Sequence, residues 1–152
     1  MPATITPERP DSADAQSLIA ELEAELDPLY PAESRHGFSV EKLLQEQVDF
    51  FIIRYDGAAA GCGGVKWFGM DYGEVKRMYV RPRFRGLGLA KMMLERLAMS
   101  ARERGVGLLR LETGVYQGEA IRLYERMGFR PIPPFGGYRD DPLSRFYEKI
   151  IR

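Results

Sequence analysis

One stretch of the chain, residues 74–90 (EVKRMYVRPRFRGLGLA), decides the fold. Residues 74–80 predict a β-strand, and an amphipathic helix follows from Leu89 onward. Between them, two glycines lie where the strand is followed by the first turn of the helix. Such a turn presents unpaired backbone N–H groups and the positive end of the helix dipole. The stretch therefore predicts a binding site for an anion such as a pyrophosphate.

The residues on either side of this stretch predict alternating helices and strands. In order, these are helices at 12–26 and near 39–44, strands at 50–55, 58–68 and 74–80, a helix at 90–104, a strand at 108–113, a helix at 119–127 and a strand at 144–151. A short strand at the start of the chain completes the set, and the segment 130–137, rich in proline and glycine, reads as a loop. The helix after residue 90 allows a parallel crossover between its flanking strands. We expect an α/β or α+β fold with a mixed sheet.

Composition narrows the class of partner. The 152 residues predict a single domain over 1–152, and 22 basic and 22 acidic side chains cancel. This balance argues against a nucleic-acid or membrane partner and favours a small molecule or a specific protein. No segment resembles a signal peptide or a membrane span, so we expect a cytoplasmic protein. The lone Cys62 excludes an internal disulfide and reads as a small buried residue.

The glycine turn does not match either of two common phosphate-binding motifs. A dinucleotide-binding fingerprint requires a parallel βαβ unit with a third glycine, whereas the strands before Arg85 are predicted to be antiparallel. A P-loop requires Lys followed by Ser or Thr directly after its second glycine, whereas Gly88 is followed by Leu89 and Ala90. Neither reading is retained.

Two segments together resemble the GNAT superfamily of N-acetyltransferases. Residues 80–90 are similar to its acetyl-CoA motif, Arg/Gln-x-x-Gly-x-Gly/Ala, through Arg85, Gly88 and Ala90. Residues 120–129 (AIRLYERMGF) are similar to its second motif, Ala-Ile-x-Leu-Tyr-x-x-x-Gly-Phe. The resemblance implies the GNAT fold, a central mixed, mostly antiparallel sheet flanked by about four helices. It also implies acetyl-CoA as co-substrate and no metal.

The resemblance assigns most of the cofactor site to two places. Backbone amides of the glycine turn would hold the pyrophosphate, and the exposed edge of the preceding strand would pair with the pantetheine arm. Gln117 stands where the family often has an Asn that holds pantetheine, and it keeps the amide while adding a methylene. The implied cofactor-binding residues are Met78, Tyr79, Val80, Arg85, Gly86, Leu87, Gly88, Leu89, Ala90 and Gln117.

The resemblance also implies two catalytic side chains. Acetyl transfer needs a neutral amine, whereas a free aliphatic amine has a pKa near about 10.4. Glu74 lies where some members carry a base, although an exposed strand residue or an ion pair with Lys76 would also explain it. Tyr124 occupies the position of the hydroxyl that protonates the departing thiol.

The acceptor site is framed in this family by the first two helices and their loop. Tyr30 and Glu33 lie there and are candidates to bind the acceptor, and His36 could be a base or an ordinary loop residue. We expect an N-acetyltransferase acting by direct attack of a small primary amine. A protein or peptide acceptor, a noncatalytic acetyl-CoA-binding module and a homodimer all stay open.

Overall fold

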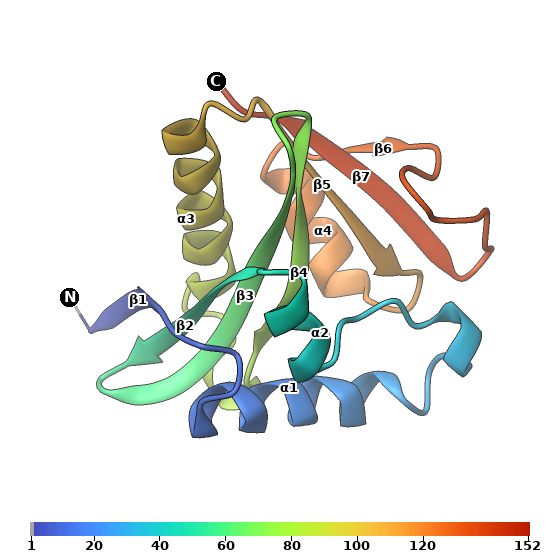
Figure 1. Ribbon diagram of the computed structural model, residues 1–152. Helices are drawn as coiled ribbons and strands as arrows, with labels where there is room; N and C mark the ends of the chain where they lie inside the picture. Colours follow the sequence, from blue (N-terminus) through green and yellow to red (C-terminus); the bar gives the residue numbers. More distant parts are fainter. Residues whose placement is uncertain (1) are drawn as a thin grey trace.

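A computed structural model of the chain describes residues 2–152 and contains one seven-stranded sheet, in the order β1-β2-β3-β4-β5-β7-β6 (Figure 1). All neighbouring strands are antiparallel except β4 and β5. The elements are β1 (Ala3–Pro7), α1 (Ala13–Leu26), η1 (Ala32–Ser34), α2 (Val40–Gln45), β2 (Asp49–Tyr55), β3 (Ala58–Phe68), β4 (Tyr72–Val80), η2 (Pro82–Phe84), α3 (Leu89–Arg104), β5 (Leu108–Gly114), α4 (Gly118–Arg126), β6 (Arg130–Ile132) and β7 (Ser144–Ile150). The expected mixed, mostly antiparallel sheet with four α-helices is confirmed.

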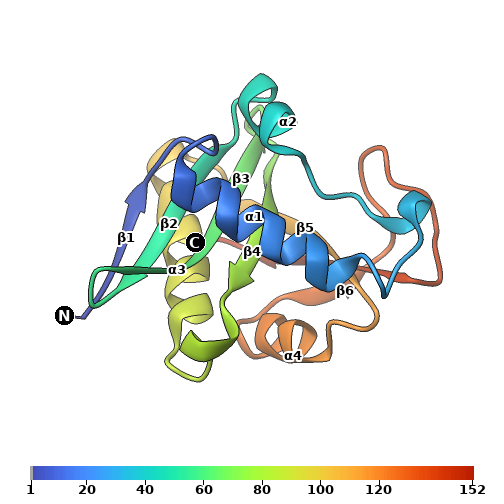
Figure 2. The same ribbon diagram turned by 90° about the horizontal axis from the view of Figure 1, so that it is seen from below.

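The helices cover both faces of the sheet and bury two separate cores. Successive side chains of a strand point to opposite faces, so Phe51 and Ile53 of β2 lie in the core that α3 and α4 also line, whereas Phe50 and Ile52 lie in the core lined by α1 and α2. Cys62 is fully buried in the second core, as expected. Figure 2 shows α1 crossing β2–β4 on this second face.

Local signals placed most element ends correctly. The Ser12 and Ser39 hydroxyls accept hydrogen bonds from the third residue along, which fixes the starts of α1 and α2. Asp56 and Gly57 both adopt left-handed φ angles in the hairpin turn between β2 and β3. The reading of 130–137 as loop is wrong at its start, because Arg130–Ile132 pairs with β7. Pro131 is tolerated there because β6 is an edge strand.

A β-bulge interrupts the pairing of β4 with β3. Cys62 pairs with Tyr79 and Gly64 pairs with Lys76, so the single residue Gly63 faces both Arg77 and Met78. Arg77 adopts a left-handed φ of 57°. Because a bulge adds one residue, it reverses the side-chain alternation beyond it and bends the strand.

The parallel pairing of β4 with β5 is short. Only Gly73 with Leu109 and Glu74 with Arg110 are paired, whereas β5 pairs along its whole length with β7 on its other side. Beyond Glu74 the two strands diverge, and the edge of β4 that faces β5 has no strand partner. The predicted parallel crossover is confirmed. The divergence of β4 and β5 opens the sheet where β4 approaches the glycine turn.

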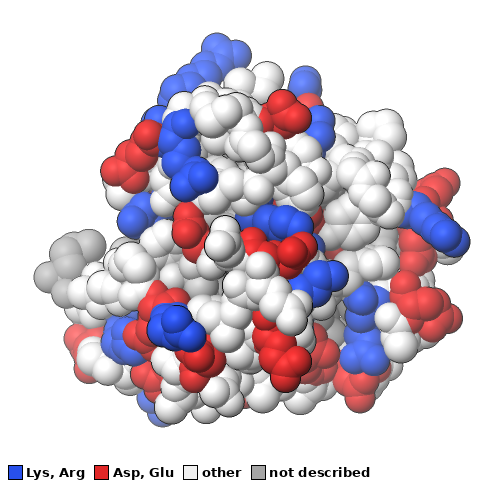
Figure 3. Space-filling view, viewed as in Figure 1, with Lys and Arg blue, Asp and Glu red and all other residues white. Residues whose placement is uncertain are grey.

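Surface charge gathers on no single patch in the view of Figure 3, where basic and acidic side chains alternate. Within residues 2–152, no helix has both the length and the apolar content to cross a membrane. In the same range, no group of three or more His, Cys, Asp or Glu side chains is placed to hold a metal ion.

The close approach of β3 and β4 at the bulge predicts the effect of one added methyl group. A Cβ on Gly61 would lie 2.5 Å from the carbonyl oxygen of Tyr79, which is backbone and cannot move aside. We expect Gly61→Ala to lower the free energy of unfolding by about 1–3 kcal/mol in urea titrations. Gly107→Ala is the matched control, because its Cβ would meet nothing nearer than 3.8 Å. Equal stability of the two variants would contradict this prediction.

Candidate active site

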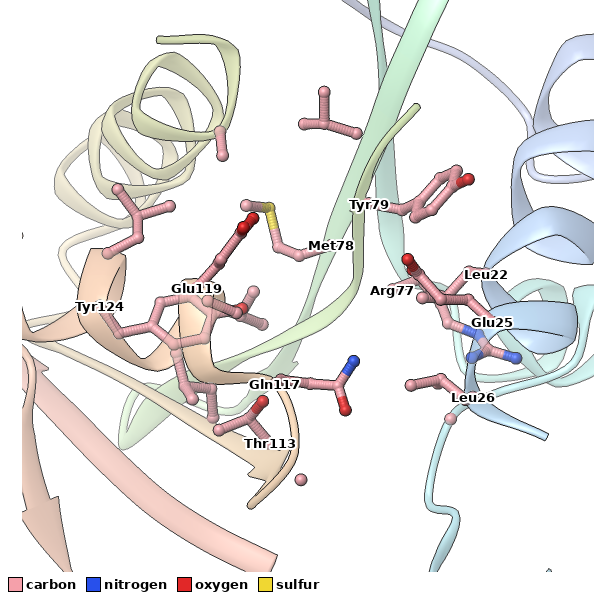
Figure 4. Close-up of a pocket in the computed structure, with 18 of the residues that line it drawn as sticks. Leu22, Glu25, Leu26, Arg77, Met78, Tyr79, Thr113, Gln117, Glu119 and Tyr124 are labelled. Carbon is pink, nitrogen blue, oxygen red and sulfur yellow. The ribbon is translucent and has the colours of Figure 1, made fainter. Parts of the chain in front are cut away.

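A cleft of about 740 Å³ occupies the space opened by the divergence of β4 and β5. Figure 4 shows its two walls, with α1 on one side, the start of α4 on the other and β4 between them. Met78 and Tyr79 on β4, Gln117 before α4 and Tyr124 within α4 all face this space or line it. The strand divergence thus brings together segments that lie far apart in the chain.

The glycine turn forms one end of the cleft. Gly86 and Gly88 have φ angles of 83° and 77°, which residues with a side chain rarely adopt. Gly88 is the N-cap of α3, and no side chain caps that helix, so its first N–H groups are open to a ligand. A Cβ built on either glycine would meet no atom within 4 Å. The turn therefore fits a pyrophosphate at a helix N-terminus.

The Arg85 side chain contacts Val80 and Glu25. Its Nε donates to the Val80 carbonyl at 2.9 Å, and its guanidinium lies 3.1 Å from a carboxylate oxygen of Glu25 on α1. The side chain lines the cleft but is paired, so phosphate binding by Arg85 requires the Glu25 contact to loosen or to be shared. Leu87 is exposed and does not line the cleft.

Tyr124 lies on the inner face of α4, where its ring packs against Phe129 with centroids 5.7 Å apart. Only 6% of the residue is exposed, and among residues 2–152 its hydroxyl has no hydrogen-bond partner. Burial, with a smaller contribution from the charge of Glu112, raises the pKa of Tyr124. The hydroxyl therefore stays protonated at neutral pH and can donate a proton into the cleft.

Glu74 and Lys76 of β4 form a buried ion pair that lines the cleft. Their charged atoms are 3.0 Å apart, and the residues are 4% and 6% exposed. The Tyr138 hydroxyl donates to Glu74 and accepts from Lys76 Nζ at 3.0 Å. Lys76 Nζ also lies 4.1 Å from the centroid of the Phe38 ring. Burial lowers the pKa of Lys76, while Glu74 opposes that change. The alternative of an ion pair with Lys76 is thus realised for Glu74.

Glu112 on β5 is a second carboxylate in the same cleft. It lines the space beside Lys76, and among residues 2–152 the one hydrogen bond to its carboxylate comes from the Ser144 hydroxyl at 2.8 Å. No cation of residues 2–152 lies within ion-pair distance of it. Burial raises the pKa of Glu112 from 4.5 to about 7. A carboxyl group with this pKa exchanges protons at neutral pH.

Of the two residues expected to bind the acceptor, Tyr30 lines the cleft and Glu33 does not. Tyr30 is buried in the cleft wall, where its hydroxyl lies 2.5 Å from Gln117 Oε1. Glu33 is exposed in η1 and is not among the residues that line the cleft. His36 lines the cleft beside Tyr138, with ring centroids 5.1 Å apart, and burial lowers its pKa.

Sequence reasoning missed Glu112, and a signal for it was present. In β5 the apolar Leu109 and Leu111 alternate with Arg110 and Glu112, although a strand in the middle of a covered sheet is expected to be apolar on both faces. A carboxylate in such a strand needs a partner or a function.

The raised pKa of Glu112 predicts a pH-dependent stability. Between pH 4.5 and about 7 the folded chain binds more protons at this group than the unfolded chain, so its contribution to stability falls as pH rises. We expect Glu112→Gln to gain about 2–3 kcal/mol relative to the native chain between pH 4.5 and pH 8. Urea titrations of both proteins at several pH values measure this. Parallel stability curves would show that Glu112 titrates normally.

Comparisons with known proteins agree with this geometry. Residues 16–129 match the model of the Acetyltransferase (GNAT) family. The chain is 43% identical over 152 residues to the IAA acetyltransferase of Azospirillum brasilense, and the aligned region covers 97% of each chain. A protein from Klebsiella pneumoniae subsp. pneumoniae, assigned as an acyl-CoA N-acyltransferase, is 37% identical, with a TM-score of 0.84 over 99% of this chain and 98% of that one.

A more distant structure shares the fold. A GNAT family acetyltransferase from Elizabethkingia anophelis, solved with acetyl-CoA bound, has a TM-score of 0.72 at 16% identity, over 98% of both chains. The family match covers most of the present chain, and two relatives exceed one third identity over nearly all of it. The chain therefore belongs to the acetyltransferase (GNAT) family.

Proposed function

We propose that the chain transfers an acetyl group from acetyl-CoA to a primary amine of a small molecule by direct attack. One observation carries the proposal: the divergence of β4 from β5 connects the glycine turn of α3 to Tyr124 within a single cleft. Acetyl-CoA supplies the acetyl thioester. The family assignment supports the reaction class, and the residues below are our assignments within it.

The cofactor end is assigned to α3 and β4. The open N–H groups of the turn at residues 85–90 hold the pyrophosphate, helped by the dipole of the 16-residue α3. The edge of β4 at Met78, Tyr79 and Val80 has no strand partner among residues 2–152 and pairs with the amides of the pantetheine arm, as an added strand would. The Val80 carbonyl already accepts from Arg85 Nε. Gln117 lies across the cleft from this edge and contributes its side-chain amide.

Tyr124 is assigned as the proton donor to the departing sulfur. Its hydroxyl is protonated and has no hydrogen-bond partner among residues 2–152, so it is free to donate. The residue is buried, and a low local dielectric strengthens a hydrogen bond to a developing thiolate.

Two carboxylates can take the proton of the acceptor ammonium. Glu74 occupies the position expected from the family resemblance, but its carboxylate already pairs with Lys76 and Tyr138. Glu112 has a single hydrogen bond and a pKa of about 7. When the ammonium loses one proton to a carboxylate, the lone pair of the amine attacks the carbonyl carbon and the carbon–sulfur bond breaks. The sulfur takes the proton of Tyr124, and the second proton of the nitrogen returns to the Tyr124 oxygen. Either carboxylate also attracts a cationic acceptor into the cleft.

Replacing Tyr124 by Phe tests the proton donor. We expect kcat to fall by about 100-fold while the KM for acetyl-CoA changes little, because the hydroxyl acts on the departing sulfur and the ring keeps its packing. Steady-state assays of thiol release measure both constants. Tyr147→Phe is the matched control, since it removes a buried hydroxyl that bonds Glu125 outside the cleft. An unchanged kcat in Tyr124→Phe would remove the assigned role.

The pH dependence of kcat/KM separates the two carboxylates. We expect the native chain to gain activity with rising pH through about 7, as Glu112 becomes deprotonated. With one acceptor held fixed, Glu112→Gln should lose this limb and Glu74→Gln should keep it at a lower overall rate. Loss of the limb in Glu74→Gln alone would assign the proton to Glu74.

A free-thiol assay across acceptor classes tests the proposed function itself. Amino acids, polyamines, aminoglycosides and short peptides cover the main amine classes, and the name of the Azospirillum brasilense relative adds IAA. Thiol release with small amines supports the proposal. Release with peptides alone would favour a protein acceptor, and CoA binding without release in any arm would favour a noncatalytic module.

A further inference from the structure

Tyr30 joins the two walls of the cleft. It follows the C-terminal end of α1, and its hydroxyl donates to Gln117 Oε1 at 2.5 Å and accepts from the backbone N–H of Tyr116 at 2.8 Å. Its ring also lies 5.5 Å from the Tyr116 ring, centroid to centroid. One side chain on the α1 wall therefore holds the turn between β5 and α4 through three contacts.

The chain makes room for this side chain at Gly114. A Cβ on Gly114 would lie 2.1 Å from the Tyr30 hydroxyl oxygen and 2.2 Å from the ring carbon that carries it. Any larger residue at position 114 would displace the tyrosine. The ring is 6% exposed, so its position is determined by packing as well as by hydrogen bonds.

Gln117 is oriented by this contact. It is the N-cap residue of α4, yet its side chain makes no capping hydrogen bond. Its oxygen faces Tyr30, and among residues 2–152 no hydrogen bond joins its amide nitrogen to another group. Figure 4 shows this nitrogen in the open space between the walls, opposite Met78 and Tyr79. The two N–H donors are therefore presented to the cleft rather than to the protein.

We propose that Tyr30 is a positioning residue that holds Gln117 with its amide N–H groups directed at an amide carbonyl of the pantetheine arm. The inference rests on the proposed function, because that function places the arm in this cleft. A free Gln side chain has several rotamers and two amide orientations, and restricting it costs conformational entropy. Tyr30 supplies this restriction before the ligand binds, which preserves affinity.

Calorimetric titration with CoA tests the role without turnover. We expect Tyr30→Phe to weaken CoA binding by roughly 3- to 10-fold, the effect of one hydrogen bond. Binding of phosphoadenosine diphosphate, which is CoA without its pantetheine arm, should be unchanged. Tyr147→Phe serves as the control, because it removes a buried tyrosine hydroxyl away from the cleft. Equal weakening of both ligands in Tyr30→Phe would indicate a general loss of structure and overturn the inference.

A double-mutant cycle tests whether Tyr30 acts through Gln117. Gln117→Ala should weaken CoA binding at least as much as Tyr30→Phe, and the double variant should be no weaker than Gln117→Ala alone. In assays of turnover, Tyr30→Phe should raise the KM for acetyl-CoA and leave kcat at saturation unchanged. Additive effects, or a raised KM for the acceptor alone, would overturn the inference.

The outcome is separable from that of the proposed function. A native chain that binds CoA and shows the coupling but releases no thiol with any amine would retain the inference and lose the transferase proposal. Thiol release together with additive variants would do the reverse.

Discussion

The bulge at Arg77 is the constraint on which the cleft depends. Arg77 is buried with a left-handed backbone, its Nε donates to the Phe38 carbonyl at 2.9 Å, and its guanidinium pairs with Glu23 of α1. The Cys62 thiol donates to its carbonyl oxygen at 3.2 Å. These contacts fix the bend of β4 and tie it to the helix that forms the opposite wall. A bulge bends its strand, and this one lies just beyond Glu74, the last residue of β4 that pairs with β5.

The bulge also explains why two adjacent cations are buried on one face. In a regular strand Lys76 and Arg77 would point to opposite faces of the sheet. The extra residue turns both toward α1 and α2, where Lys76 meets Glu74 and Arg77 meets Glu23. A buried charge is costly unless it is paired, so the buried Glu74, Lys76 and Arg77 are each restrained by an ion pair. Burial raises the pKa of Glu112, and no cation of residues 2–152 lies within ion-pair distance to offset it.

The two ends of the cleft differ in what holds them. At the glycine turn the groups that face the cleft are backbone N–H groups, whose positions follow from the left-handed φ angles of Gly86 and Gly88. At the end that we propose for the acceptor, the lining groups are side chains from four segments: β4, β5, the loop after α1 and the loop between β6 and β7. Tyr138 reaches Glu74 across 64 residues of sequence, and Tyr30 reaches Gln117 across 87. The first kind of site is local, and the second exists only after folding.

The amino-acid sequence by itself determined the helix start at Ser39, the Asp56-Gly57 hairpin, the glycine turn and the place of Tyr124 in a helix, and it narrowed the start of α1 to Asp11 or Ser12. Each of these depends on interactions within a few residues, which a local pattern records. The fold class followed from the order of the predicted elements and from the two family motifs. The short β6 was missed because its edge pairing with β7 overrides its proline. Only the tertiary structure decided that Glu74 pairs with Lys76, that Tyr30 faces Gln117 and that Glu112 lies in the cleft without a cation. These outcomes depend on the bend of β4 and on burial, which arise from contacts between distant segments. The alternation in β5 marks Glu112 as unusual for a covered strand, but it does not record which groups surround the carboxylate.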